Sequence, residues 1–150
     1  MFTKILLPTD GSEAAGRAAQ AALDLASRYG ASVEIVSVVD SLPFVYFSDG
    51  SGGGGGGGEA LACYLDAAEA AAKQGIAFAE ASARVAGVAF SSHVLREHGP
   101  AQAICDHAQS SGCDLIVMGS HGRRGLDAVI LGSVAQKVLT LAKSPVLVVK

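Results

Sequence analysis

The chain has 150 residues and a mass of 15.0 kDa, which suits one domain and leaves little room for two. Half of the residues are hydrophobic and the mean hydropathy is +0.40, so a sizeable core can form and global disorder is excluded. Eleven Lys and Arg residues against fourteen Asp and Glu give a net charge of −3, and Trp is absent. A dedicated nucleic-acid-binding protein, with a basic surface and stacking aromatic side chains, is therefore not expected.

The cysteines and the N-terminus favour a reducing, aqueous compartment. Cys63, Cys105 and Cys113 form no CxxC pair and no cluster with histidines at zinc-binding spacing. They predict free thiols, and no metal site is expected. No apolar run approaches the roughly 18 residues of a membrane span, and the N-terminus runs directly into a strand-like segment without a signal peptide. We expect a cytoplasmic protein that does not contact the membrane.

The first elements are clearly bounded. Residues 5–7 form a short apolar run that ends at Pro8 and predicts a buried strand. Ser12 offers a helix N-cap, and alanines recur at helical spacing as far as Gly30, a residue type typical of a left-handed C-cap. The pattern predicts a helix over residues 12–29.

A long irregular segment follows the second strand. Residues 33–39 are largely apolar and β-branched and predict that strand, and seven consecutive glycines occupy residues 52–58. Because glycine loses the most backbone entropy on ordering, we expect a flexible loop at about residues 48–58. A lid over a ligand, a plain surface connection and an artificial linker in place of a natural segment are all compatible with this run.

The alternation then continues. The Ala-rich residues 59–86 predict a helix with a weak point at Gly75. Residues 88–95 alternate imperfectly and predict a strand near an edge of the sheet. Pro100 opens a further helix that ends near Gly112.

The last elements complete a parallel α/β pattern. Residues 115–118 predict a fully apolar strand that stops at Gly119, residues 131–142 predict a helix, and Pro145 precedes a final strand, Val146–Val149. Strands without strict alternation, separated by helices, imply a parallel sheet with helices on both faces. Ligands of such open sheets bind at the carboxyl ends of the strands.

Two segments at strand carboxyl ends are candidates for a ligand site. Asp10 follows the first strand. Gly119 and Gly122 follow the fourth, and nine residues later Gly132 and Ser133 begin a helix. Glycine lets backbone N–H groups approach phosphate oxygens, and a helix N-terminus adds unpaired donors. The spacing is compatible with phosphate binding.

The residues alone leave a second interpretation of these glycines open. Glycines between a strand and a helix are common as plain turn residues, and the patterns GxxxxGK[ST] and GxGxxG after the first strand are absent. Arg123 and Arg124, between the glycines, are candidates for phosphate contacts or for solvated loop cations.

The histidines form no evident cluster. We expect His121, inside the Gly-containing loop, to fix the loop by hydrogen bonding rather than to act as a general acid or base. His93, His98 and His107 have no matching partners in the sequence and are expected to be ordinary surface or strand residues.

Three segments together resemble the universal stress proteins of the UspA type. They are KILLPTDGS from Lys4, DLIVMGSHGR from Asp114 with LGSVA from Leu131, and SPVLVV from Ser144. The resemblance covers almost the whole chain apart from the region around the glycine run. It implies one domain over residues 1–150, with a Rossmann-like, adenine nucleotide alpha hydrolase-like fold: an open five-stranded parallel sheet of order 3-2-1-4-5 with two helices on each face.

The ATP-binding members of this family carry G-x-x-G, nine residues and G-[ST], and the glycines named above match that pattern. The resemblance assigns to the adenosine Pro8, Asp10, Val38, Met118 and Gly119. It assigns to the phosphates Gly122, Gly132, Ser133, Val134 and Ala135. Ala135 stands where some members have a small hydroxyl residue, which implies one phosphate hydrogen bond fewer. No catalytic residue and no metal ligand is assigned.

The resemblance implies a cytoplasmic regulatory protein of the stress response that binds ATP, or AMP or ADP, with Mg. The alternatives are a slow ATPase or nucleotide hydrolase, and a stress protein that binds no nucleotide and acts only through protein partners. No base beside a positioned water and no carboxylate pair is evident, so an enzyme is less favoured. The apolar edge strand Val146–Val149 invites pairing, and the family implies a homodimer through this strand. Regulatory protein partners are implied but not identified.

Overall fold

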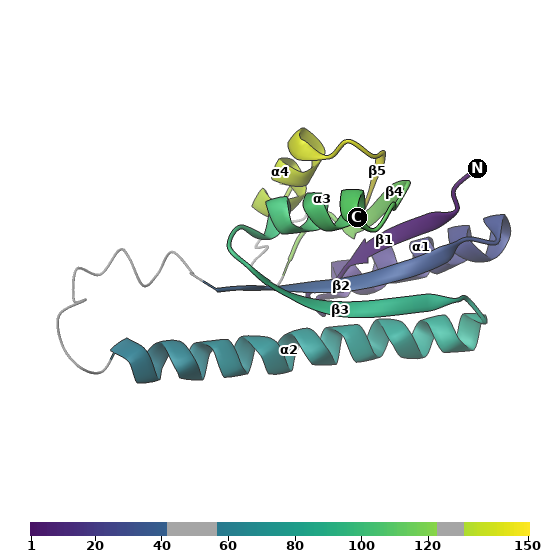
Figure 1. Ribbon diagram of the computed structural model, residues 1–150. Helices are drawn as coiled ribbons and strands as arrows, with labels where there is room; N and C mark the ends of the chain where they lie inside the picture. Colours follow the sequence, from purple (N-terminus) through teal and green to yellow (C-terminus); the bar gives the residue numbers. More distant parts are fainter. Residues whose placement is uncertain (42–56, 123–130) are drawn as a thin grey trace.

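Strands and helices alternate along the chain in the expected order (Figure 1). The computed structural model describes residues 1–41, 57–122 and 131–150. The elements are β1 (Lys4–Pro8), α1 (Glu13–Tyr29), β2 (Ser32–Asp40), α2 (Gly57–Ala86), β3 (Phe90–Glu97), α3 (Pro100–Ser110), β4 (Leu115–Gly119), α4 (Ser133–Leu141) and β5 (Val146–Val149).

The five strands form one parallel sheet of order β3-β2-β1-β4-β5, as predicted. β1 lies at the centre between β2 and β4, and Ile5 of β1 is in register with Leu115 of β4. The direction of winding reverses between these two strands. Their carboxyl ends therefore lie side by side, and the chain leaves them toward helices on opposite faces.

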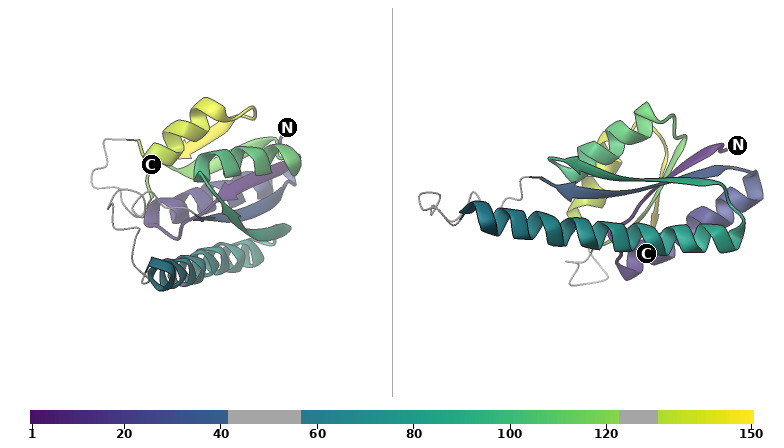
Figure 2. Two further views of the ribbon diagram at one scale, coloured as in Figure 1. Left: turned by 60° about the vertical axis from the view of Figure 1, so that its left-hand side comes forward. Right: turned by 60° about the horizontal axis from the view of Figure 1, so that its bottom comes forward.

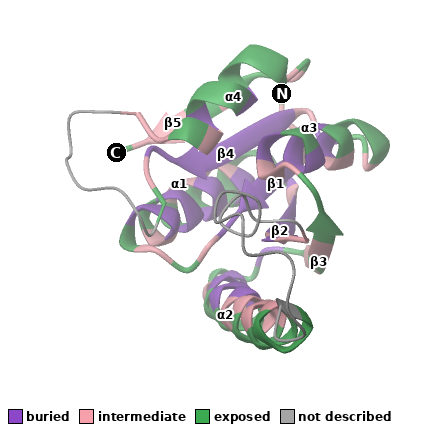
Figure 3. Ribbon diagram, turned by 90° about the vertical axis from the view of Figure 1, so that its left-hand side faces the viewer, coloured by how far each residue is buried: buried purple, intermediate pink, exposed green. Residues whose placement is uncertain are grey.

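Two helices cover each face of the sheet (Figure 2). Ile5 and Leu7 of β1 are buried with α1 and α2, and Leu6 is buried with α3 and α4. Successive side chains of a strand point to opposite faces, so a strand in the middle of such a sheet must be apolar at every position. Figure 3 shows β1 and β4 as buried ribbons at the centre of the molecule.

α1 has the predicted caps. Ser12 accepts a hydrogen bond from the Ala15 N–H on its side-chain oxygen at 3.2 Å, and Gly30 closes the helix with φ of 68°. The buried face of α1 is almost entirely alanine, which lets the helix lie close to the sheet.

α2 departs from the expectation at its start and at Gly75. It begins at Gly57, so two glycines of the run lie in the helix, and the remainder of the predicted loop lies outside the described residues. The buried hydrophobic side chains of α2, such as Ile76 and Ala83, lie in its second half, and the first turns extend past the sheet (Figure 1). Gly75 is a contact point rather than a weak point: a Cβ there would lie 2.9 Å from the Gly11 nitrogen.

Two predicted boundaries shift for local reasons. β3 begins at Phe90 because Val88 still donates its N–H to a carbonyl of α2 after the left-handed Gly87. β3 is an edge strand, as predicted. α4 begins at Ser133 because Gly132 is extended. Among the helices in the described ranges, none combines the length and the apolar character needed to cross a bilayer.

Candidate functional site

The carboxyl edge of the sheet brings the two predicted segments together. Asp10 follows β1 and Gly122 follows β4, and Oδ2 of Asp10 lies 2.7 Å from the position that a Cβ at residue 122 would occupy. The other oxygen, Oδ1, accepts a hydrogen bond from the Ser12 N–H at 3.0 Å, which fixes the turn into α1. Any side chain at position 122 would therefore displace the Asp10 carboxylate.

The two ends of the connection between β4 and α4 also meet. The N–H of Gly132 donates to the Ser120 carbonyl at 2.8 Å, and a Cβ at residue 132 would lie 3.1 Å from that oxygen. Glycine allows this close approach, which sets the start of α4 against the end of β4. Arg123 and Arg124, the candidate loop cations, lie outside the described residues.

The start of α4 offers backbone donors. Gly132 precedes the helix with φ of −62° and ψ of 151°, and no side chain in the described part of the chain caps this end. The N–H groups of the first helical turn, which belong to Ser133, Val134 and Ala135, have no acceptor within the helix. The methyl group of Ala135 is buried in the core, so this residue can offer a ligand only its backbone.

Gly119 has a packing role that the sequence pattern does not distinguish from ligand contact. A Cβ at this position would lie 2.8 Å from the Ala14 carbonyl carbon and 2.9 Å from its oxygen. Glycine here allows α1 to lie directly against the end of β4. Of the two glycines after Met118, Gly122 is the exposed one and Gly119 is buried.

The residues expected at the adenosine lie at the end of the three central strands. Pro8 and Met118 are buried at the ends of β1 and β4. Val38 of β2 is partly buried and packs in the same apolar cluster as Met118, under α3 and α4. The structure thus gathers these side chains at one edge of one sheet face, next to the Asp10 turn.

His121 makes a side-chain hydrogen bond to the residue before it. Its Nδ1 lies 2.8 Å from the side-chain oxygen of the buried Ser120. Its Nε2 is buried and has no hydrogen-bond partner among the described residues. Because an unsatisfied buried polar atom is costly, this nitrogen is a point at which a bound ligand or water would be stabilised.

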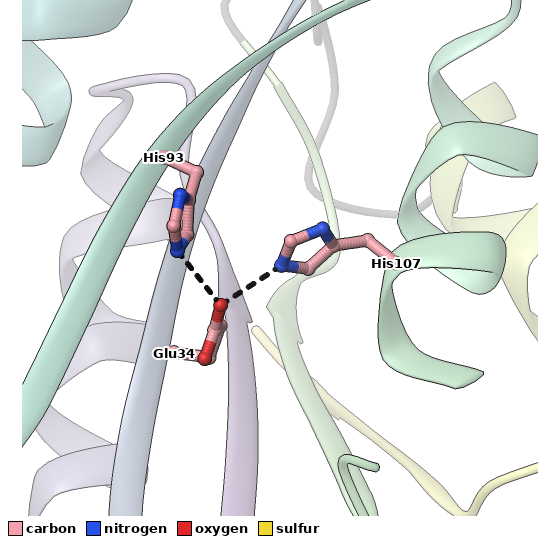
Figure 4. A group of neighbouring side chains, drawn as sticks. All are labelled: Glu34, His93 and His107. Carbon is pink, nitrogen blue, oxygen red and sulfur yellow. Dashed lines mark hydrogen bonds and ion pairs between the residues drawn. The ribbon is translucent and has the colours of Figure 1, made fainter. Parts of the chain in front are cut away.

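His93 lies on a strand, as expected, whereas His107 lies in α3, and the two share a partner that the sequence does not indicate. Both place Nε2 3.0 Å from the same oxygen, Oε1 of the buried Glu34 (Figure 4). Burial alone would raise the pKa of Glu34, but hydrogen bonds from Lys4, His107 and Ser91, with the charge of Lys4, lower it to about 2. Because the partners of Glu34 come from distant parts of the chain, the sequence offers a single indication of this cluster, a glutamate inside an apolar strand.

The sequence similarity to known proteins extends over the full length of this chain. Universal stress protein MJ0531 of Methanocaldococcus jannaschii is 35% identical over 150 residues, which cover all of this chain and 83% of that protein. A universal stress protein of Thermus aquaticus is 35% identical over all of both chains.

Solved structures give the same result for the fold. The structure of the protein MJ0577 superposes with a TM-score of 0.82 at 27% identity, covering 100% of this chain and 96% of that one. Two universal stress protein structures share the fold at lower identity. One, from Archaeoglobus fulgidus, is in complex with dAMP (TM-score 0.66, 22% identity, 100% and 98% covered), and the other is in complex with cAMP (TM-score 0.60, 23% identity, 99% and 96% covered).

The sheet order, the paired segments at its carboxyl edge and these full-length similarities agree with one another. The model of the universal stress protein family matches residues 1–150, and the chain belongs to that family.

Proposed function

We propose that this chain is a nucleotide-binding universal stress protein that holds ATP, or AMP or ADP, at the carboxyl edge between β1 and β4. The observation that carries the proposal is the contact between Gly122 and Asp10, since a residue without a Cβ lets the segment after β4 lie directly against the carboxylate that follows β1. The buried Nε2 of His121, which has no hydrogen-bond partner in the described part of the chain, lies next to Gly122 and supports a ligand there.

The donors at this edge suit the phosphates. Ser133, Val134 and Ala135 offer N–H groups at the start of α4, where the helix dipole favours an anion, and Ser133 adds a hydroxyl. Gly122 and Gly132 allow their backbones to approach closely. Magnesium would accompany ATP by binding to its phosphate oxygens, which are the hard ligands that this ion prefers.

The residues at the strand ends suit the adenosine. Val38 and Met118 supply apolar surface for the base, with Pro8 at its edge. Asp10 is an acceptor for ribose hydroxyl groups, and the backbone of Gly119 lies at the adjacent strand end. The complexes with dAMP and cAMP in relatives show that this fold can hold an adenine nucleotide in those proteins. The glycine spacing of this chain extends the inference to it.

The proposed role is regulatory. The described residues near the site offer no pair of carboxylates positioned for phosphoryl transfer, so we propose binding that biases a surface toward protein partners rather than turnover. The free thiols Cys63, Cys105 and Cys113 suit a reducing compartment such as the cytoplasm.

We further propose a homodimer through β5. β5 is an edge strand of the sheet, and Leu147 at its middle is 40% exposed. An apolar edge strand with unpaired backbone groups favours pairing with a second copy.

The test of nucleotide binding is thermal unfolding of nucleotide-free protein with millimolar Mg-ATP, AMP or GTP. Ligand at a hundred times its dissociation constant adds about 2.7 kcal/mol, which raises the midpoint by several degrees. We expect a shift with adenine nucleotides and none with GTP. Gly122→Val should abolish the shift, because its side chain would displace the Asp10 carboxylate. Gly58→Val, where a Cβ would have none of the described residues within 4 Å, should retain it.

No shift with any nucleotide would contradict the proposal and favour a stress protein that acts only through partners. Phosphate release that persists after repurification and is lost in Asp10→Ala would instead favour the hydrolase.

A further inference from the structure

A second cluster, of one carboxylate and two imidazoles, lies outside the carboxyl edge of the sheet. Glu34 is the third residue of β2, His93 is in β3 and His107 is in the last turn of α3. The three meet on the sheet face covered by α3, toward the amino ends of the strands, and Figure 4 shows both imidazoles turned toward Glu34. The candidate nucleotide site uses none of them.

The geometry of the cluster is that of a metal-ligand set. His93 and His107 direct the same ring nitrogen, Nε2, to Oε1 of Glu34, at 3.0 Å each, and the ligand atoms of the three residues all lie within 4.8 Å of one another. Zinc–ligand bonds of about 2.0 Å at tetrahedral angles separate neighbouring ligand atoms by about 3.3 Å. The two nitrogen–oxygen separations are therefore within a few tenths of an ångström of those in a zinc site.

The other oxygen of Glu34 is held by different groups. Oε2 accepts a hydrogen bond from the Ser91 hydroxyl at 2.9 Å and lies 2.7 Å from the Lys4 ammonium. Ser91 is directly opposite Glu34 in the pairing of β2 with β3. Partners of this kind orient a ligating carboxylate and leave one oxygen directed at the metal. Glu34 is thus positioned to bind through Oε1 alone.

The three side chains of the cluster differ in how far they are exposed to solvent. The Glu34 side chain is 5% exposed, that of His107 is 18% exposed and that of His93 is 50% exposed. A metal at this point would have a rigid inner side and a side open to water. Two imidazoles and one carboxylate with a position left for water is a common donor set for zinc.

We propose that Glu34, His93 and His107 form a binding site for a divalent transition metal with the preferences of zinc, with water as the fourth ligand. The site has no counterpart in the glycine pattern of the family and is independent of the proposed nucleotide site. Without metal, the two imidazoles hold the same oxygen through Nε2–H groups, and the metal takes the place of those protons.

The experiment is calorimetric titration of chelator-treated protein with ZnCl2 in the absence of nucleotide, because ATP itself binds zinc. We expect one zinc per chain. His93→Gln and His107→Gln should each weaken the affinity by at least about tenfold, since even the loss of a group that orients a ligand costs that much.

His98→Gln is the matched control. His98 is an exposed histidine that lies 3.2 Å from a carboxylate oxygen of Asp40, so it is a histidine–acid pair without a second imidazole. Cys63→Ser removes the exposed thiol as a competing zinc ligand. Both variants should bind zinc as the parent chain does.

Three results would overturn the proposal: no stoichiometric binding at micromolar zinc, an affinity unchanged in His93→Gln, or a loss in His98→Gln equal to that in His93→Gln. If His107→Gln fails to fold, His93→Gln still decides, because its side chain is half exposed. Nitrogen-15 spectra of the parent chain give an independent readout: zinc should shift the Nε2 resonances of His93 and His107 and leave those of His98 in place.

Discussion

Thr3 and Asp114 join the start of β1 to the start of β4: the backbone N–H and the hydroxyl of Thr3 both donate to Oδ2 of Asp114 at 2.8 Å. The N–H of Lys4 donates to Oδ1 at 3.2 Å. Burial would raise the pKa of Asp114, but these three hydrogen bonds favour the charged carboxylate, and the pKa is lowered. The charged carboxylate of Asp114 therefore joins β1 to β4 at their amino ends, and we call this contact the clamp.

The clamp predicts a pH-dependent contribution to stability. Because the pKa of Asp114 is lower in the folded state, its contribution is complete above the unfolded value of about 3.9 and is lost as the pH falls through the folded value. Asp114→Ala should lower the free energy of unfolding by about 1 kcal/mol at pH 7, and this difference should shrink below about pH 4. Urea unfolding at pH 7, 5 and 3 measures it.

Gly75 tests the packing of α2 against the loop after β1. Alanine is favoured over glycine in helices by about 1 kcal/mol, so propensity alone predicts that Gly75→Ala is stabilising. We expect the opposite, a loss of about 1–3 kcal/mol, because the new Cβ would lie 2.9 Å from backbone of Gly11. Gly58→Ala in the same helix meets nothing within 4 Å and should be neutral or stabilising. A stabilised Gly75→Ala protein would refute the close contact.

Gly119 and Gly122 should separate folding from binding. Gly119→Ala places a methyl group 2.8 Å from backbone of Ala14 and should lower the free energy of unfolding by about 1–3 kcal/mol. Among the residues that the structure describes, Gly122→Ala meets the movable Asp10 carboxylate alone, so we expect little change in stability and weaker nucleotide binding. Chemical denaturation and nucleotide titration of both variants are the measurements. Equal effects on stability would contradict this division.

The proposed dimer has a specific test in β5. The carbonyl of Pro145 accepts a hydrogen bond from Ile116 of β4, and that of Val149 accepts one from Ser120, directly after β4. The backbone groups of Val148 therefore point to the open side of the sheet. Val148→Pro removes an N–H on that side and should convert a dimer of 15.0 kDa chains into a monomer in light scattering. Val148→Thr keeps the N–H and should remain dimeric. A parent chain that is monomeric at micromolar concentration would exclude the dimer.

The parts of the fold that sequence predicts well are those with local causes. Ser12 and Gly30 mark the ends of α1 because capping depends on the neighbouring few residues alone. The sheet order came from motif resemblance, since periodicity does not specify which strands are neighbours. The sequence does not indicate that α2 begins at Gly57, because glycine has a low helix propensity. The long helix that follows overcomes this low propensity.

The parts that sequence predicts poorly depend on contacts between distant segments. Gly75 carries no local sign that its missing side chain makes room for Gly11. The glycine pattern does not separate Gly119, where a Cβ would meet the backbone of Ala14, from Gly122, where it would meet the Asp10 carboxylate. The cluster of His93 and His107 with Glu34 cannot be recognised in the sequence, because it forms only when β3 and α3 bring the two histidines to Glu34.

Glu34 also bears on how the chain finds its strand register. Its neighbours Val33 and Ile35 are buried in the apolar layer beneath α1 and α2, whereas Glu34 reaches Lys4, Ser91 and the imidazoles on the other face. A slip of one residue along β2 would turn the carboxylate into a layer of alanine and aliphatic side chains that offers it no partner. In a sheet whose central strands are apolar on both faces, this one charge discriminates against misaligned pairings that hydrophobic patterning alone would tolerate.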